Sequence, residues 1–281
     1  MRTITQIKRM QKISDELRRE KKTIGFVPTM GYIHEGHLSL IDVSNRNSDI
    51  TVASIFVNPT QFGAGEDYRE YPRDIEMDKM LLKKRRCSFL FYPDVDAMYS
   101  KYFKTEVYVK DLSRFLCGIR RKTHFKGVTT VVAKLFNIVK PDIAVFGQKD
   151  AQQAIIIKRM VEDLNYNTKV IIAPIIREKD GLAMSSRNVY LAKGERKDAT
   201  VIYNSLKETE HMIENGVRNV SIIVRRIREM ISSKKSARID YIKAVETKDL
   251  KPVNEIKGEV LIAVACYFGK ARFIDNIIVK V

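Results

Sequence analysis

The chain has 281 residues, 44% of them hydrophobic and 30% charged, a composition typical of a soluble globular protein with one large domain or a large and a small one. No apolar run of about 18 residues occurs, and residues 1–6 lack the apolar segment of a secretory signal, so we expect neither a membrane partner nor export. The formal net charge is +17, but the basic groups are short and dispersed, and no zinc-finger or RNA-binding signature occurs, so we expect no nucleic-acid partner. The three cysteines lie far apart without a C-x-x-C pair, which argues against disulfides or a cysteine zinc site and favours a reducing, cytoplasmic location.

Apolar strands alternate with helices over the first 175 residues. Apolar residues at helical spacing predict a helix over 3–22, and a short strand follows at 23–28 and ends at a proline. The alternation then predicts a helix from about 36, strand 50–57, helix 75–86, strand 89–92, helix 127–139, strand 143–146, helix 150–164 and strand 170–173. This order predicts an α/β fold with a Rossmann-like parallel sheet, as the unbroken apolar character of strand 50–57 also indicates.

The pattern changes after about residue 176. A polar loop leads to two charged helical stretches, and short strands follow; we expect helices at 194–215 and 219–233 and strands at 239–246, 259–267 and 271–279. We therefore predict two domains: a Rossmann-like nucleotide- and substrate-binding domain over 1–175, and a smaller α+β C-terminal lid domain over 176–281.

The tetrapeptide His34-Glu35-Gly36-His37 joins the first central strand to the next helix. Ligands of open α/β sheets bind at the carboxyl ends of strands, where a helix N-terminus offers backbone N–H groups to phosphate. Imidazoles at i and i+3 share one helix face and can donate to a triphosphate as pyrophosphate leaves. A zinc site is disfavoured, because the zincin pattern needs histidines at i and i+4; unrelated surface histidines are the other alternative.

A second polar loop, residues 178–188, contains Met184-Ser185-Ser186-Arg187. Its hydroxyls and guanidinium suit phosphate oxygens, and it resembles the loop that closes over ATP phosphates in the HxGH superfamily. The alternative is that a serine merely caps a helix. In this order, the two motifs together favour an adenylate-forming site.

Four further segments extend the pattern: 54–62 around Asn58-Pro59-Thr60-Gln61, Tyr71-Pro72-Arg73, 124–132 beginning His124-Phe125-Lys126-Gly127, and Phe146 to Gln153. With the two loops above, the chain resembles the pantothenate synthetases (pantoate–β-alanine ligases) of the HxGH nucleotidylyltransferase superfamily. The resemblance is dense from about 24 to 193 and thinner to the end.

The resemblance implies an ATP-dependent condensation of pantoate with β-alanine through a pantoyl adenylate, with ATP as substrate and Mg²⁺ as cofactor. It gives His34, His37 and Lys149 catalytic roles, with His37 matching the residue usually assigned as proton donor. The implied ATP-binding residues are Met30, Gly31, Tyr32, Ile33, His34, Glu35, Gly36, His37, Gly147, Gln148, Lys149, Asp150, Ile176, Met184, Ser185, Ser186 and Arg187.

For the organic substrates the resemblance implies Gln61 and Gln153 as pantoate-binding amides, completed by Asn58, Arg121 and His124. Asp78 is the candidate carboxylate ligand of Mg²⁺. The segment 63–67 is expected to be flexible. The loop that follows it and the 184–188 loop with the C-terminal domain are candidate covers over a water-sensitive intermediate, and a homodimer is implied. Tyr32-Ile33 replaces a more usual small-plus-Leu pair, and we expect both side chains to face away from the phosphates.

Three other functions stay open at this point. Another HxGH nucleotidylyltransferase, acting on a phosphate ester, would share the tetrapeptide but would not need Gln61 and Gln153. A basic RNA-binding module would explain the charge and leave both loops without a role. A class I aminoacyl-tRNA synthetase would need an anticodon-binding extension for which this chain is short.

Overall fold

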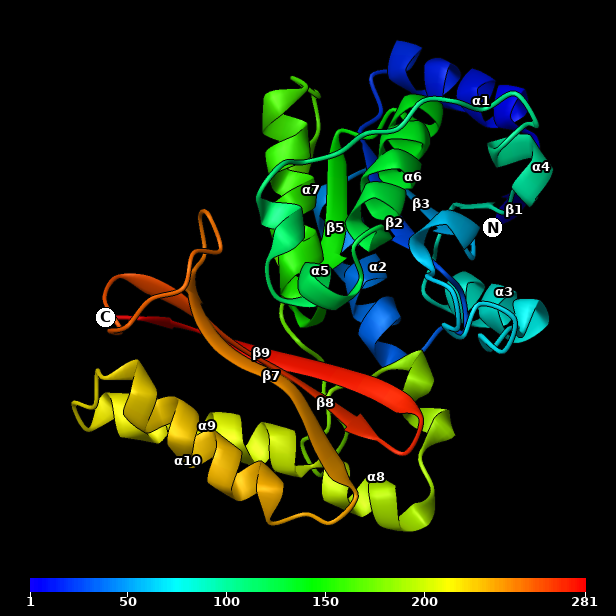
Figure 1. The fold of residues 1–281 in the computed structure, drawn as a ribbon. Coiled ribbons are helices and arrows are strands. Elements are labelled where there is room, and N and C mark those ends of the chain that lie inside the picture. Colours follow the sequence, from blue (N-terminus) through cyan, green and yellow to red (C-terminus); the bar gives the residue numbers. More distant parts are fainter. The chain divides into compact units, whose positions relative to one another are not determined.

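The computed structural model describes all 281 residues and divides into two compact units (Figure 1). The first unit comprises Met1–Gln148 and Gln153–Pro174; the second comprises Lys149–Gln152 and Ile175–Val281. The division after Pro174 lies one residue from the boundary expected from the sequence, and the short segment from Lys149 to Gln152 groups with the second unit.

The first unit is built on a six-stranded sheet with the order β1-β4-β3-β2-β5-β6, in which every pair is parallel. Its strands are β1 (Arg2–Ile4), β2 (Ile24–Thr29), β3 (Ile50–Ile55), β4 (Phe89–Phe91), β5 (Ile143–Gly147) and β6 (Lys169–Ala173). From β2 the chain winds outward through β3 and β4, and then returns to add β5 and β6 on the other side of β2. The strand order therefore reverses between β2 and β5, where open α/β sheets bind their ligands.

Helices connect the strands of this unit: α1 (Ile7–Arg19), α2 (Glu35–Asn47), α3 (Ile75–Lys84), α4 (Val95–Met98), α5 (Cys117–Arg120), α6 (His124–Val139) and α7 (Ala151–Asp163). Three short 3-10 turns are η1 (Pro59–Gln61), η2 (Leu112–Arg114) and η3 (Gln148–Asp150). Leu38 and Ile41 of α2 pack in one core with Val27, Ala53 and Val145 of the central strands. This buried face fixes α2, and with it the start of the helix, over the middle of the sheet.

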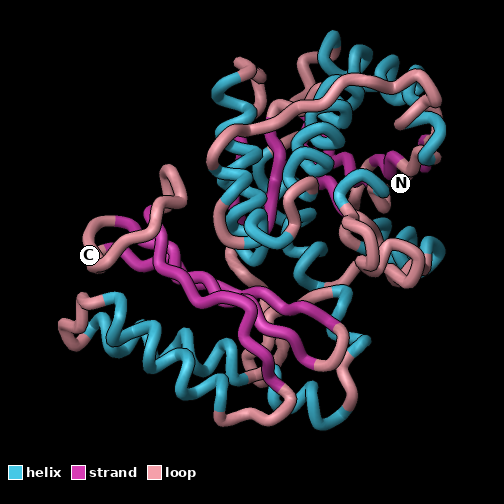
Figure 2. Tube along the Cα trace, in the orientation of Figure 1, coloured by secondary structure: helices cyan, strands magenta, loops and turns pink.

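The second unit is an α+β layer pair. Its elements are η4 (Ser186–Tyr190), α8 (Lys193–Ala199), α9 (Val201–Glu214), α10 (Val220–Ser232), and the antiparallel strands β7 (Ala237–Glu246), β8 (Glu259–Phe268) and β9 (Ala271–Lys280). Figure 2 shows α9 and α10 side by side along one face of this sheet. Ile223, Ile227 and Ile231 recur every four residues on α10 and share a core with Ile262 and Val264 of β8.

Two local predictions from the sequence are wrong. The helix expected over 3–22 begins only at Ile7, because Arg2–Ile4 forms an edge strand paired with Phe89–Phe91. The single helix expected over 194–215 is two helices that meet at Thr200. The Thr200 hydroxyl donates to the Lys197 carbonyl at 2.8 Å, a side-chain bond that competes with the helical backbone pattern.

No helix in the chain combines the length and the apolar character needed to cross a membrane.

Candidate active site

The turn between β2 and α2 adopts backbone angles that few residues accept. Gly31 has φ +86° and Tyr32 has φ +53°, in the left-handed region. The buried carboxylate of Asp78, on α3, accepts hydrogen bonds from both following amides, Tyr32 N at 2.9 Å and Ile33 N at 2.6 Å. A Cβ on Gly31 would lie 3.0 Å from Asp78 Oδ2, so this close approach requires glycine as well as the positive φ.

The two histidines of the tetrapeptide cap the helix that carries them. His34 is the N-cap of α2, and its Nδ1 accepts from Gly36 N at 3.1 Å. His37 Nδ1 accepts from His34 N at 3.4 Å, and the two ring centroids are 4.1 Å apart. A ring nitrogen that accepts a hydrogen bond carries no proton, so each neutral imidazole is protonated at Nε2. The donor atom of each neutral ring is therefore Nε2, near the positive end of the α2 dipole.

The side chain of Glu35, within the same tetrapeptide, forms an ion pair with an arginine at the end of α3. Its carboxylate lies 2.5 Å from Arg85, which caps the end of α3 and also binds Asp42 at 2.9 Å. The side chain of Glu35 is thus held on α3, and its backbone, at the first turn of α2, is the part suited to an anion. Asp78 and Arg85 together connect α3 to both sides of the turn. The sequence reasoning did not identify Arg85.

A cluster of amides lies beside this turn. Asn58 caps η1, and its Nδ2 donates to Gln61 Oε1 and to the Gly127 carbonyl, each at 3.1 Å. Gln61 Nε2 lies 2.9 Å from the sulfur of Met30, at the end of β2. Tyr99, which sequence reasoning missed, donates its hydroxyl to Asn58 Oδ1 at 2.9 Å. These contacts bring three of the predicted residues together at the carboxyl ends of β2 and β3.

Arg121 and His124 join the same cluster through the backbone of Gln61. His124 Nδ1 is 2.8 Å and Arg121 Nη2 is 3.3 Å from the Gln61 carbonyl oxygen, and Arg121 Nη1 is 3.1 Å from His124 Nε2. Arg121 is also paired bidentately with Glu66, at 2.7 and 2.5 Å. Burial opposes ionisation of Glu66, but the hydrogen bonds and charge of Arg121 outweigh it and hold the pKa of this carboxyl below its ordinary value. The segment 63–67, expected to be flexible, is thereby held to Arg121 at Glu66.

The remaining predicted residues before Pro174 lie at the end of β5 and in the segment after it. Gly147 ends β5, next to β2 in the sheet, and a Cβ there would meet only the tip of Leu40 at 4.0 Å, which leaves room for a ligand. Gln148 begins η3, and Gln153 lies in the first turn of α7. Lys149 and Asp150 complete η3 and form an ion pair with 3.5 Å between Nζ and Oδ2.

The second motif lies on the second unit. Met184 N donates to the Ile176 carbonyl at 3.0 Å, which places these two predicted residues side by side. Ser185 is the N-cap of η4 and accepts from Arg187 N at 3.3 Å, so the capping alternative describes its contacts in this structure. Ser186 is buried. The phosphate-binding role of this loop stays a prediction.

Asp78 does not belong to a group of side chains that could hold a metal ion. No group of three or more His, Cys, Asp or Glu side chains that could hold a metal ion occurs in the chain. Both carboxylate oxygens of Asp78 accept backbone N–H groups, and only 2% of the residue is exposed. The residues present therefore do not form a Mg²⁺ site around Asp78, and its observed contacts assign it to the turn.

A sequence model of the family described as pantoate-beta-alanine ligase matches residues 2–278 of this chain. The chain belongs to the pantoate-beta-alanine ligase family. A pantothenate synthetase from Caldicellulosiruptor bescii is 54% identical over 280 residues, covering 100% of this chain and 99% of that protein. These matches confirm the resemblance inferred from the motifs.

Solved structures of this family share the fold. A pantothenate synthetase from Thermus thermophilus has a TM-score of 0.93 and 42% identity, with 99% of each chain covered. A pantoate-beta-alanine ligase from Francisella tularensis, in complex with beta-gamma ATP and beta-alanine, has a TM-score of 0.81 and 34% identity, covering 99% of this chain and 97% of that chain. The predicted fold class, a Rossmann-like parallel sheet followed by a smaller α+β layer, is confirmed.

Proposed function

We propose that the chain is an ATP-dependent ligase that joins pantoate to β-alanine, yielding pantothenate, AMP and pyrophosphate. The observation that carries the proposal is the contact between Gln61 Nε2 and the Met30 sulfur, 2.9 Å apart. It links a cluster of amides, suited to a ligand with a carboxylate and hydroxyls, to the turn that presents two imidazole donors. A phosphate-ester nucleotidylyltransferase would need the imidazoles but not the amide cluster.

In the first step a carboxylate oxygen of pantoate attacks the α-phosphorus of ATP, the bond to the bridging oxygen breaks, and pyrophosphate leaves. The protein's contribution to such a transfer is mainly positioning and charge stabilisation. The Nε2–H groups of His34 and His37 donate to phosphate oxygens whose charge grows as pyrophosphate departs. Lys149 supplies a compact positive charge for the same oxygens.

In the second step the amine of β-alanine attacks the acyl carbon of pantoyl adenylate, AMP leaves with the bonding electrons, and the nitrogen loses a proton. Because an acyl adenylate reacts readily with water, the site has to exclude it. We assign this covering role to the loop from Met184 to Arg187. Gln61 and Gln153 hold the pantoyl group, with Asn58, Arg121 and His124 maintaining the position of Gln61.

The proposal includes Mg²⁺ as a cofactor. The ion would arrive on the triphosphate, since Mg²⁺ usually keeps several waters and binds through substrate phosphates rather than a full set of protein ligands. We further propose a cytoplasmic enzyme that acts as a homodimer, as the family resemblance implied. Size-exclusion chromatography with light scattering tests the dimer.

The deciding experiment is exchange of labelled pyrophosphate into ATP, run with and without D-pantoate and in the absence of β-alanine. We expect exchange only with pantoate, because adenylation is reversible before the amine attacks. Exchange supported instead by a phosphate ester such as nicotinamide mononucleotide, or none with pantoate, would contradict the proposal.

The roles of individual residues are tested in single-turnover adenylation. We expect His37→Ala and Lys149→Ala each to slow pantoyl adenylate formation by about 10²-fold or more, as for the loss of one preorganised donor to a developing charge. Circular dichroism checks that both variants fold. Wild-type rates in either folded variant would contradict the role of that residue.

A further inference from the structure

The base of the loop that contains Met184–Arg187 is fixed by backbone hydrogen bonds. Arg177 and Ala183 form an antiparallel bridge, and Glu178 N donates to the Leu182 carbonyl at 2.8 Å. Arg177 also ties this turn to β9, with 2.6 Å between its Nη1 and Asp275 Oδ2. Beyond these bonds, Asn188 N donates to the Ser185 carbonyl at 2.9 Å within η4, and side chains connect this segment to the base of the loop.

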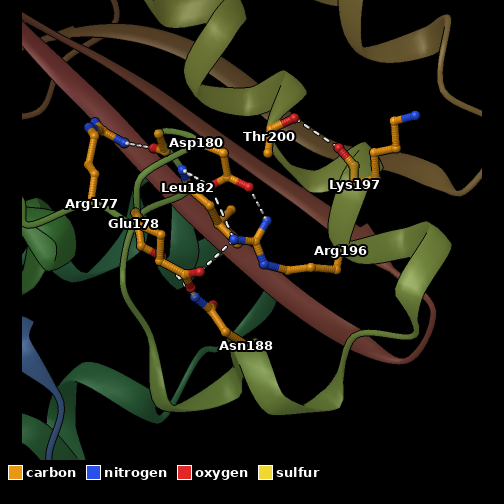
Figure 3. A network of polar contacts seen from close by, with 10 residues as sticks. Arg177, Glu178, Asp180, Leu182, Asn188, Arg196, Lys197 and Thr200 are labelled. Carbon is orange, nitrogen blue, oxygen red and sulfur yellow. Dashed lines mark hydrogen bonds and ion pairs between the residues drawn. The ribbon is translucent and has the colours of Figure 1, made fainter.

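Arg196 on α8 binds two carboxylates of this turn, as Figure 3 shows. Its Nη1 lies 2.7 Å from Asp180 Oδ2, while its Nη2 lies 3.1 Å from Asp180 Oδ1 and 2.5 Å from Glu178 Oε2. The hydrogen bonds from Arg196 hold the pKa of Asp180 below its ordinary value. A planar guanidinium can make this three-bond arrangement, whereas a lysine ammonium lacks the matching fork.

Glu178 connects Arg196 to the far end of the loop. Its second oxygen, Oε1, accepts from Asn188 Nδ2 at 2.6 Å (Figure 3). The same Asn188 nitrogen lies 3.3 Å from the Ala183 carbonyl. Asn188 directly follows Arg187 in the chain. We call Glu178, Asp180, Asn188 and Arg196 the loop clasp. Through it, one guanidinium on α8 restrains both the residues before Met184 and the residue after Arg187.

We propose that Arg196 is a positioning residue, which orders the Ser185–Arg187 segment for the phosphates of ATP through Glu178 and Asn188. This inference rests on the proposed function. Ordering a loop on binding costs free energy, and a loop that is ordered beforehand binds its ligand more tightly. The Arg196 and Glu178 side chains are 26% and 32% exposed. A partly exposed ion pair of this kind adds little to global stability, so its main effect is local.

The test compares Arg196→Met with a matched control, Arg226→Met. Arg226 pairs with Glu208 at 3.1 Å between α9 and α10, in the same unit but outside the loop clasp. In pantoate-dependent exchange we expect R196M to raise the KM for ATP about tenfold, equivalent to about 1.4 kcal/mol at 25 °C. The KM for pantoate and the rate at saturating ATP stay near wild type. R226M leaves all three values unchanged.

Two further variants locate the effect. In a double-mutant cycle, R196M and Glu178→Gln together raise the KM for ATP by less than the product of their separate effects, because both break the same link. Arg196→Lys recovers part of the affinity, since it retains the charge but not the fork. An unchanged KM for ATP in R196M, or an equal rise in R226M, would overturn the proposal.

Hydrogen exchange of the ligand-free protein separates this inference from the proposed function. We expect the backbone amides from Met184 to Asn188 to exchange faster in R196M than in the wild type, and at the wild-type rate in R226M. Unaltered protection in R196M would refute the loop clasp even if the enzyme reaction is as proposed. Altered protection in a protein without pantoate-dependent exchange would leave the loop clasp standing and refute the function.

Discussion

Asp78→Asn tests whether a buried carboxylate positions the histidine turn. Burial raises the pKa of Asp78, although the hydrogen bonds from Ile33 and Tyr32 act to lower it. When folding raises the pKa of a carboxyl, the free energy of unfolding of the protein falls as the pH rises from the unfolded-state pKa through the folded-state pKa of that group. Burial of the ionised carboxyl is thus unfavourable, and we attribute its two backbone contacts to the geometry of the turn.

The magnitude follows from the two hydrogen bonds. An asparagine keeps one oxygen, so one of the two amides now bonded at 2.9 and 2.6 Å loses its acceptor and faces an NH₂ group. An unsatisfied buried N–H costs about 1–3 kcal/mol, and removal of the buried charge offsets part of this. We expect the free energy of unfolding to fall by about 1 kcal/mol. The adenylation rate falls more, by about 10²-fold, as expected when reacting groups are misplaced by about 1 Å.

Urea denaturation and pantoate-dependent pyrophosphate exchange measure the two effects separately. Asp142→Asn is the matched control, because Asp142 Oδ2 accepts from Ile24 N at 2.8 Å at the amino end of β2, away from the turn. The control should lose stability without losing the exchange rate. A D78N protein that is folded and exchanges at the wild-type rate would refute the reasoning.

Local contacts support three further predictions. Gly127→Ala should lower the free energy of unfolding, measured in urea, by about 2 kcal/mol, because a Cβ there would lie 2.4 Å from the Thr60 carbonyl oxygen. The same clash should raise the KM for pantoate. A variant with unchanged stability and unchanged KM would show that α6 and η1 are not packed this closely. Burial raises the pKa of Cys87 to about 11 and that of Cys266 to about 12. Both thiols should therefore resist Ellman's reagent at pH 8 until the protein is unfolded, and site-resolved mass spectrometry would measure this. Because the folded-state pKa of Glu66 is depressed, its ionised carboxylate stabilises the folded protein above the unfolded-state pKa, and this stabilisation is lost as the pH falls below about 4.5. Glu66→Gln should therefore make the free energy of unfolding depend less steeply on pH in acid.

Much of the first unit was predictable because its elements are long and periodic. Strand 50–57 and the helix after Gly36 follow from apolar runs and from spacing, and the tetrapeptide was expected at a strand–helix turn, where it lies. The edge strand Arg2–Ile4 was missed, because three residues show no period and the strand depends on its pairing with β4. The break at Thr200 was missed because both flanking stretches are helical.

The residues that hold the motifs in place were harder to predict than the motifs themselves. Asp78 is 46 residues from Tyr32 in sequence, and nothing in its immediate neighbourhood distinguishes an acceptor of backbone amides from a metal ligand. Glu66 and Arg121 are separated by 55 residues, and the tertiary fold brings them together. Long-range pairs of this kind depend on tertiary structure, which a single sequence does not specify through periodicity.

The contacts of His34 and His37 connect folding of the turn with its proposed chemistry. Each Nδ1 accepts a backbone N–H at the start of α2, and this bond determines that Nε2 holds the proton in the neutral ring. The rotation of both rings and the placement of their donors therefore depend on the helix start, which in turn depends on the amides held by Asp78. The turn, the caps and the donors are therefore coupled, so a change at Asp78 should displace the imidazoles that we propose bind the ATP phosphates, although Asp78 itself contacts only the turn.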